Sequence, residues 1–70
     1  MKNDYCEYLK KHREMRCYTQ WQISRVLNLS HGAYGLIELG KRRLPAEYAS
    51  KLADFYGISV DELLGRDKHG

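Results

Sequence analysis

Apolar residues recur at spacings of three and four along most of the chain. This is the period of an α-helix with one buried face, and no segment shows the alternation of apolar and polar residues that a half-buried strand requires. The pattern therefore predicts an all-α protein built from five short helices. The expected helices cover residues 4–16, 19–27, 31–39, 45–56 and 60–64.

The starts of these helices are marked by residues whose side chains can bond free N–H groups, or whose ring suits a first helical turn. Thr19 and Gln22 have the spacing of a capping box, as have Ser59 and Glu62. The other expected start residues are Asn3 or Asp4, Ser30 and Pro45.

Three helices end at residues that accept the left-handed backbone conformation with little strain, namely Asn28, Gly40 and Gly57. Only Asn28, Leu29 and Ser30 separate the second helix from the third. Two helices joined by so short a turn must cross steeply, as in a helix-turn-helix.

The third expected helix has an unusual outward face. With Ile37 placed at the core and successive residues 100° apart, Ala33, Tyr34 and Ile37 face inward. A glycine in a helix interior costs about 1 kcal/mol relative to alanine, and helix packing does not explain Gly35 because it points outward. The outward residues, of which only the histidine can hydrogen-bond a base edge, are His31, Gly32, Gly35, Leu36 and Leu39.

Positive charge is concentrated in the first part of the chain. Residues 1–43 hold nine Lys and Arg against four Asp and Glu, whereas residues 44–70 hold three against five. The formal net charge is +3. This asymmetry favours a polyanionic partner for the N-terminal part.

The length of 70 residues allows one domain, expected over residues 1–65, with a flexible tail at 66–70. Cys6 and Cys17 would lie about 16 Å apart on one helix, beyond the roughly 7 Å that a disulfide spans. We expect free thiols in a reducing compartment, with Cys6 in the core. The sequence shows no leader segment and no run of about 20 apolar residues, so we expect a cytoplasmic protein without a membrane span.

Catalysis and cofactor binding are not expected. His12, His31 and His69 have no metal-ligand spacing, and the two cysteines do not form a CxxC motif. The chain also lacks a glycine-rich phosphate loop and a nucleophile elbow. The sequence therefore predicts no enzyme activity, no cofactor, no metal and no small-molecule substrate.

Short motifs lie in one common register along the chain. They are Leu9 with Arg13, Thr19-Gln20, Ile23, Leu27, Leu29-Ser30, Ala33-Tyr34, Ile37-Glu38-x-Gly40-Lys41-Arg42, Pro45, Leu52-Ala53 and Ser59-x-x-Glu62-Leu63-Leu64. In these motifs the sequence resembles the helix-turn-helix family of phage repressors, Cro proteins and small bacterial xenobiotic-response-element-type regulators. The resemblance implies a compact five-helix lambda-repressor-like DNA-binding domain, with the helix-turn-helix formed by helices 2 and 3 and the third helix in the major groove.

The same resemblance places His31, Gly32 and Leu36 where side chains of the family reach base edges. One explanation of this face is that Gly32 and Gly35 let the backbone approach the groove floor while Leu36 touches thymine methyl groups. The other is that the face is merely tolerated and phosphate contacts position the protein. We expect modest specificity, drawn more from thymine methyl groups and DNA shape than from hydrogen bonds to bases.

Phosphate contacts are expected around this face. Thr19 and Gln20 stand at the start of the second helix, where free N–H groups and the helix dipole favour an anion. Trp21 either donates its indole N–H to a phosphate or packs on the domain. The basic run that follows the third helix is expected to flank the groove and consists of Lys41, Arg42 and Arg43.

The resemblance also implies an ion pair between Arg13 and Glu38, which would join the first helix to the end of the third. Cys17, Ser24 and His12 depart from residues that are usual in the family. A left-handed Cys17 would cost about 1 to 2 kcal/mol in place of glycine. Ser24 would need a local hydrogen-bond partner between the second and third helices. His12 is expected at the edge of the core.

The predicted function is sequence-preferring binding of double-stranded DNA by a transcriptional regulator, a repressor of bacterial or phage origin associated with the nucleoid. A homodimer is expected, at least on DNA, with candidate interfaces on the fourth and fifth helices. The alternative is a protein-interaction module on the same scaffold, in which Trp21, Leu36 and Leu39 form an exposed apolar patch.

Overall fold

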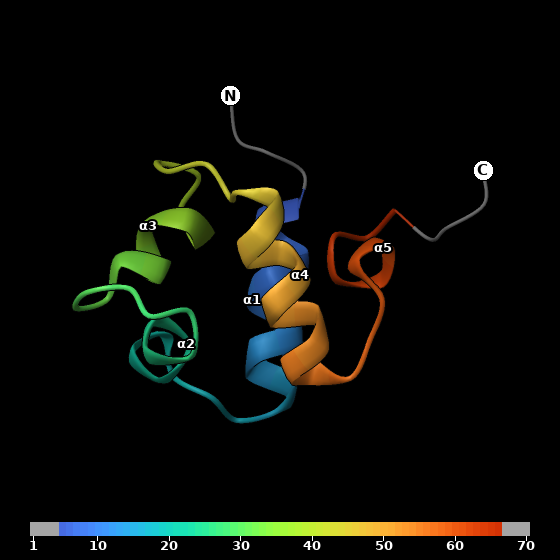
Figure 1. Ribbon diagram of the computed structural model, residues 1–70, viewed down its shortest axis with the longest axis horizontal. Coiled ribbons are helices and arrows are strands. Elements are labelled where there is room, and N and C mark those ends of the chain that lie inside the picture. Colours follow the sequence, from blue (N-terminus) through green and yellow to red (C-terminus); the bar gives the residue numbers. More distant parts are fainter. Residues whose placement is uncertain (1–4, 67–70) are drawn as a thin grey trace.

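The computed structural model of the protein describes residues 5–66. Within that range it contains five α-helices and no strand, as the periodicity predicted (Figure 1). The expected cap at Asn3 or Asp4 and the expected tail after Arg66 lie outside the described residues. The helices are α1 (Tyr5–Met15), α2 (Gln20–Val26), α3 (Ala33–Glu38), α4 (Ala46–Tyr56) and α5 (Val60–Leu63).

The helices pack in two groups around α1. The α3 helix packs against α1 and α2, while α5 packs against α1 and α4. In Figure 1, α1 and α4 occupy the middle of the view, with α2 and α3 on one side and α5 on the other. The pair formed by α2 and α3 therefore stands at one side of the domain.

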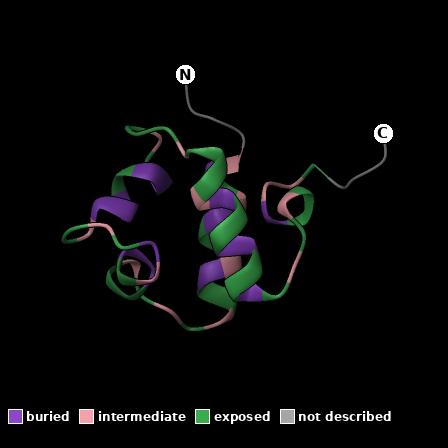
Figure 2. Ribbon diagram, in the orientation of Figure 1, coloured by how far each residue is buried: buried purple, intermediate pink, exposed green. Residues whose placement is uncertain are grey.

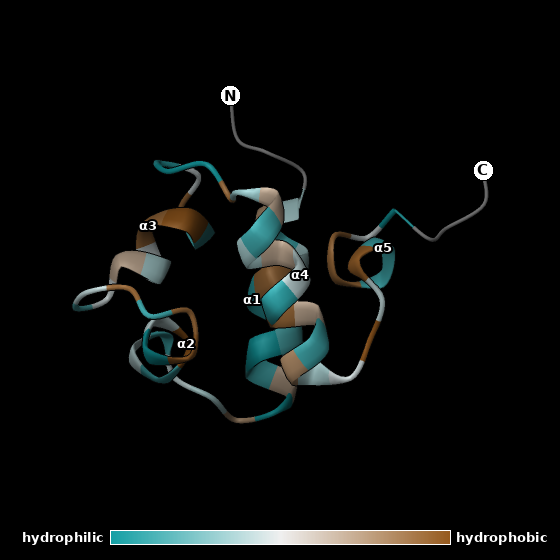
Figure 3. Cartoon of the chain, in the orientation of Figure 1, coloured by the Kyte–Doolittle hydropathy of each residue, from teal (hydrophilic) through white to brown (hydrophobic). Residues whose placement is uncertain are grey.

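All five helices contribute to a single core. Each helix contains buried residues, which are purple in Figure 2, and Figure 3 shows apolar residues, in brown, among the helices. Tyr34 is the largest fully buried side chain. Full burial of a large apolar side chain contributes about 1.5 to 3 kcal/mol to the stability of the folded state. A small number of such residues is therefore enough to stabilise this small fold. The core residues are Leu9, Ile23, Leu27, Tyr34, Ile37, Ala49, Leu52, Ala53, Tyr56 and Leu63.

The predicted N-cap of α2 is confirmed. The Thr19 hydroxyl accepts a hydrogen bond from the Gln22 N–H at 3.1 Å, and the Thr19 N–H donates to the Gln22 side chain at 2.8 Å. This reciprocal pair is a complete capping box. Ser59 caps α5 in the expected way, because its hydroxyl accepts from the Glu62 N–H at 3.0 Å.

The predicted start of the third helix is wrong. The α3 helix begins at Ala33, and Gly32 rather than Ser30 is its N-cap. Ser30 instead lies in a turn, where its carbonyl accepts from the Ala33 N–H at 2.9 Å. Gly32 takes the left-handed conformation, with φ of 56°, and this lengthens the turn by two residues. His31 and Gly32 therefore precede the helix.

A serine from the neighbouring helix provides the hydrogen bond that an N-cap side chain would otherwise make at the start of α3. The hydroxyl of the buried Ser24 in α2 accepts a hydrogen bond from the Tyr34 N–H at 3.0 Å. Tyr34 is in the first turn of α3, where backbone N–H groups lack helical partners. The local partner that the sequence required for Ser24 is thus the backbone of the helix it packs against.

The predicted helix stops are confirmed. Asn28, Gly40 and Gly57 all have positive φ, with values of 62°, 78° and 74°. Each reverses the chain just beyond a helix, where the left-handed conformation satisfies the last carbonyl groups. Pro45 is the N-cap of α4 rather than a residue of its first turn.

The side chains of His12 and Cys6 contribute to the attachment of α1 to other helices. His12 lies at the edge of the core as expected, and its Nε2 is 3.0 Å from the Glu62 carbonyl oxygen of α5. Cys6 is buried, and its thiol donates to the Ile37 carbonyl of α3 at 3.3 Å. Cys6 and Cys17 are both free thiols, as the spacing predicted.

Cys17 occupies the left-handed position after α1, with φ of 62°. We expect Cys17→Gly to raise the free energy of unfolding by about 1 kcal/mol, because glycine adopts this conformation without steric strain. The cysteine side chain is exposed, so little packing is lost. Urea unfolding followed by circular dichroism measures the change. Cys17→Ala keeps the β-carbon and is the control; a glycine variant no more stable than the alanine variant would contradict the strain.

Candidate nucleic-acid interface

The α2 and α3 helices form a helix-turn-helix unit. They pack directly on each other, and the turn between them runs from Leu27, which caps α2, to Gly32, which caps α3. Ser24 lies between them and is almost completely buried. The outer side of this unit is the surface on which the expected binding residues lie.

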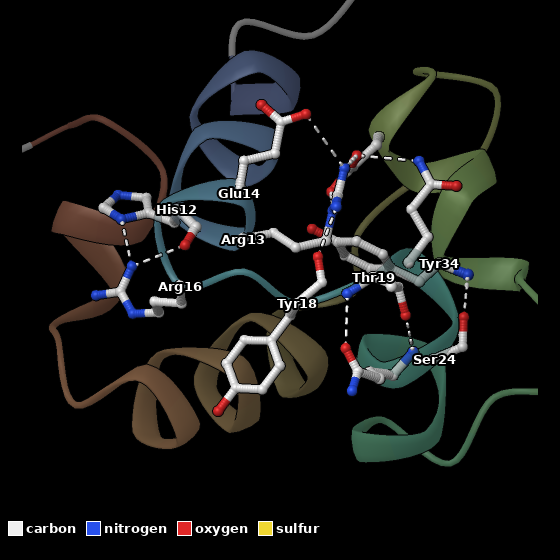
Figure 4. A network of polar contacts seen from close by, with 11 residues as sticks. His12, Arg13, Glu14, Arg16, Tyr18, Thr19, Ser24 and Tyr34 are labelled. Atoms are coloured by element: carbon white, nitrogen blue, oxygen red, sulfur yellow. Dashed lines mark hydrogen bonds and ion pairs between the residues drawn. The ribbon is translucent and has the colours of Figure 1, made fainter.

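An ion pair fixes the end of α3 to α1. The Arg13 Nε donates to Glu38 Oε2 at 2.7 Å, and a second guanidinium nitrogen donates to Oε1 at 3.1 Å. The third nitrogen donates to the Tyr18 carbonyl at 2.8 Å, as the dashed lines from Arg13 in Figure 4 show. The implied pair between Arg13 and Glu38 is therefore confirmed, in the two-pronged geometry that strengthens an Arg–carboxylate contact.

The surroundings keep this pair charged. Burial by itself would raise the pKa of Glu38, but hydrogen bonding, first of all from Arg13, outweighs it and holds that pKa below its usual value. The hydrogen bond to Glu38 raises the pKa of Arg13 further. Burial, followed by the charge of Glu38, raises the pKa of the Tyr34 hydroxyl. A neutral tyrosine and a charged pair therefore share this interior at neutral pH.

The Gln20 side chain belongs to the same network. It reaches from the first turn of α2 to α3, where its Nε2 donates to Glu38 Oε1 at 3.1 Å. Gln20 is half-buried, so its carboxamide lies between the ion pair and the surface. The sequence placed Gln20 at the interface but gave no sign of this contact, because the two residues are 18 positions apart.

The predicted orientation of Gly35 is wrong. Gly35 is buried, and an added β-carbon would lie 2.7 Å from Gln20 Oε1. The carboxamide of Gln20 covers the glycine, so Gly35 does not line the outer surface of α3. Placing the residues of one helix at 100° intervals assigns every residue that points away from the core to the solvent-exposed surface. It takes no account of a side chain from another helix that covers such a residue.

The outer face of the unit is apolar with one imidazole. Leu36 of α3 and Leu39, the C-cap of that helix, are exposed, as are Trp21 of α2 and His31 of the turn. The Trp21 and His31 rings meet edge to face, with centroids 5.3 Å apart and planes at 66°. This pair joins the first turn of α2 to the residue before Gly32, and nothing in the residue pattern predicts the contact.

The expected phosphate-binding residues surround this face. Lys41, Arg42 and Arg43 are exposed and form no ion pair within residues 5–66. The backbone N–H groups of Lys41 and Arg42 donate to the Leu36 carbonyl at 2.9 and 3.2 Å, so the basic run starts against the end of α3. Arg43 also lines an open groove with residues of α4 and α5.

Other kinds of site are not evident in the part of the chain that the structure describes. No group of three or more His, Cys, Asp or Glu residues there is arranged to hold a metal ion. Among the same residues, no helix has the length and apolar character needed to cross a bilayer.

Comparison with known proteins gives a consistent assignment. A family model described as helix-turn-helix matches residues 9–63. The SPβ prophage-derived uncharacterized HTH-type transcriptional regulator YonR of Bacillus subtilis is 34% identical over 58 residues, which is 83% of this chain and 54% of the relative. The uncharacterized HTH-type transcriptional regulator YobD of the same organism is 30% identical over 61 residues, or 87% of this chain and 54% of the relative.

The chain thus spans about half the length of the curated relatives that it matches. No solved structure gives a significant match. The family match covers both helices of the unit, the Arg13–Glu38 pair and the basic run, which are the features that the geometry brings together. The protein is a member of the Cro-type helix-turn-helix family of transcriptional regulators.

Proposed function

We propose that this protein binds double-stranded DNA in a sequence-preferring manner and represses transcription. The observation that carries the proposal is the exposed face of α3 beside Lys41, Arg42 and Arg43, whose charges are not neutralised within residues 5–66. Free cations next to the exposed side of a helix suit the phosphates that border a major groove. Family membership supports the same conclusion.

In this proposal the turn and the first half of α3 enter the major groove. His31 donates or accepts a hydrogen bond at a base edge, and Leu36 contacts thymine methyl groups. Gly32 has no atom within 4 Å of an added β-carbon, so its backbone is open to a close approach by DNA. Because this face offers one polar side chain, the specificity is modest and owes much to DNA shape.

Phosphate contacts come from residues on both sides of that face. Gln20, Thr19 and Trp21 lie at the start of α2, and the indole N–H of Trp21 is a donor suited to a phosphate oxygen. The second set is the basic run after α3. A homodimer on two half-sites, about one helical turn apart, matches the general behaviour of such domains. For this activity the protein would act in the cytoplasm as a regulator associated with the nucleoid.

A second function is favoured by one observation. Trp21, Leu36 and Leu39 are 54%, 43% and 61% exposed, and exposed apolar side chains that form one patch often mark a protein interface. The same scaffold could use them to bind another protein in place of DNA. The Trp21 side chain then acts as an apolar anchor rather than as a phosphate donor.

Salt titration with a randomised duplex pool tests the two functions. If DNA is the partner, the logarithm of the affinity falls linearly with the logarithm of salt concentration, at a slope of about −0.9 per phosphate neutralised. Selection from the pool then yields a preferred sequence, and His31→Ala changes it at one position. An unchanged preference in that variant would remove His31 as a base reader. Salt-insensitive self-association that depends on Trp21, without DNA retention at low salt, would support the protein-interaction module instead.

A further inference from the structure

We propose that Gly35 and Glu38 are positioning residues that hold the Gln20 carboxamide in the orientation in which it donates to DNA. The inference rests on the proposed DNA-binding function. Neither residue touches the nucleic acid in this arrangement. Glu38 holds one end of the carboxamide, and Gly35 leaves the space that the other end occupies.

Glu38 determines the orientation of the Gln20 carboxamide, that is, which end is the nitrogen and which is the oxygen. Its carboxylate can only accept hydrogen bonds, so the group 3.1 Å from Oε1 must be the amide nitrogen of Gln20. An amide nitrogen carries two hydrogens, and one of them is used by Glu38. The second remains for a partner on the outer side, and a phosphate oxygen is an acceptor of the required kind.

Arg13 makes this arrangement compatible with DNA. A lone carboxylate beneath the interface would repel the phosphate backbone. The guanidinium of Arg13 bonds both oxygens of Glu38, at 2.7 and 3.1 Å, and neutralises its charge. Gln20 is thereby connected through Glu38 to α1, which lies outside the helix-turn-helix unit.

Gly35 provides the space for the carboxamide oxygen. A β-carbon at this position would lie 2.7 Å from Gln20 Oε1 and 3.2 Å from Gln20 Cδ. The first distance is shorter than a real contact allows, so one group must move. The obstructing atoms are the end of a flexible side chain, and the backbone of Gly35 is helical. Gln20 would therefore leave its position while the fold stays intact, and its bond to Glu38 would be broken.

This arrangement explains a glycine that helix propensity disfavours. Alanine is the better helix former, so Gly35→Ala is expected to keep or raise the melting temperature. The same change is expected to weaken DNA binding about tenfold, near the lower end of the loss that one hydrogen bond to a charged group implies. Higher stability with lower affinity is a combination that damage to the fold would not produce.

A double-mutant cycle on DNA binding tests the inference. Gly35→Ala, Gln20→Ala and the double variant are compared on the selected duplex, with melting temperatures recorded for each. We expect the two single variants to lose affinity equally and the double variant to lose no more than Gln20→Ala. The salt slope should stay unchanged in all three, because Gln20 carries no charge. If Gly35→Ala binds like the wild type, or weakens binding further when Gln20 is already alanine, the inference is overturned.

A measurement on the free protein separates this inference from the proposed function. The side-chain amide resonances of Gln20 in a ¹⁵N-labelled sample should be shifted from those of exposed glutamines, and Gly35→Ala should move them to the exposed values. Unshifted resonances in the wild type would overturn the arrangement whether or not DNA binds. Shifted resonances in a protein that retains no DNA at low salt would overturn the proposed function, and with it the role of the contact, while confirming the contact itself.

Discussion

Replacing Arg13 with methionine is expected to lower the free energy of unfolding by about 3 to 5 kcal/mol. The reason is that Glu38, whose side chain is 3% exposed, would keep its charge in the interior without a cation. The Gln20 amide, at 3.1 Å, would remain as a hydrogen-bond donor to the carboxylate, but it carries no positive charge. At about 0.05 to 0.15 kcal/mol per residue, a domain of 70 residues is stable by only about 4 to 10 kcal/mol, so the variant should be close to unfolding. Urea unfolding monitored by circular dichroism gives the value.

The chain offers a matched control for this prediction. Arg66 and Asp61 also form an ion pair with a nitrogen-to-oxygen distance of 3.1 Å, but their side chains are 63% and 64% exposed. Arg66→Met should therefore cost at most about 1 kcal/mol. A comparable loss in both variants would contradict the importance of burial. Adding Glu38→Met to Arg13→Met should restore most of the stability, because the orphaned charge is removed.

The pH dependence of stability provides an independent check on the same pair. The pKa of Glu38 is lower in the folded protein than its ordinary value. Its contribution is therefore fully present above the unfolded pKa, about 4.3, and is lost as the pH falls through the folded value. The variant with methionine at both positions should lack this part of the acid-induced loss.

Changing Lys41, Arg42 and Arg43 together to alanine is expected to weaken DNA binding on the order of 100-fold at low salt, for all sequences alike. If each cation neutralises one phosphate, the magnitude of the log–log salt slope should decrease by about 2.7. The sequence selected from a random pool should not change, because phosphate contacts carry no base information. Fluorescence anisotropy over a range of salt concentrations measures both quantities.

A second triple variant separates position from total charge. Lys10, Lys11 and Lys51 are exposed on α1 and α4, and their change to alanine removes the same formal charge. We expect this variant to lose much less affinity and to keep nearly the wild-type slope. Equal losses in the two triple variants would mean that net charge, rather than the place of the basic run beside α3, governs binding.

The helices and most of their ends were predictable from short stretches of sequence. The Thr19 capping box and the stops at Asn28, Gly40 and Gly57 were each predicted and confirmed. These features depend on bonds between residues three to five positions apart, so the local sequence contains both partners. The Arg13–Glu38 pair was also foreseen, but only through the resemblance to a family.

The parts that failed involve α3 and its neighbour. Ser30 was the only capping residue in the local sequence, yet the hydroxyl of Ser24 bonds the first turn of α3 from another helix. Gly35 was assigned to the outer surface because no residue within α3 covers it. Gln20 covers it from α2.

The sequence by itself therefore determined the number of helices, the inward residues Ala33, Tyr34 and Ile37 of α3 and most of the chain reversals, because each follows from local bonding and apolar periodicity. Only the tertiary structure decided where α3 begins, what Gly35 faces and how Gln20 is held. Those outcomes depend on the packing of α3 against α2, which brings groups ten or more positions apart in the sequence within hydrogen-bond distance. Neither the apolar periodicity of the sequence nor helix propensity specifies which side chain will fill the space between two helices that pack together.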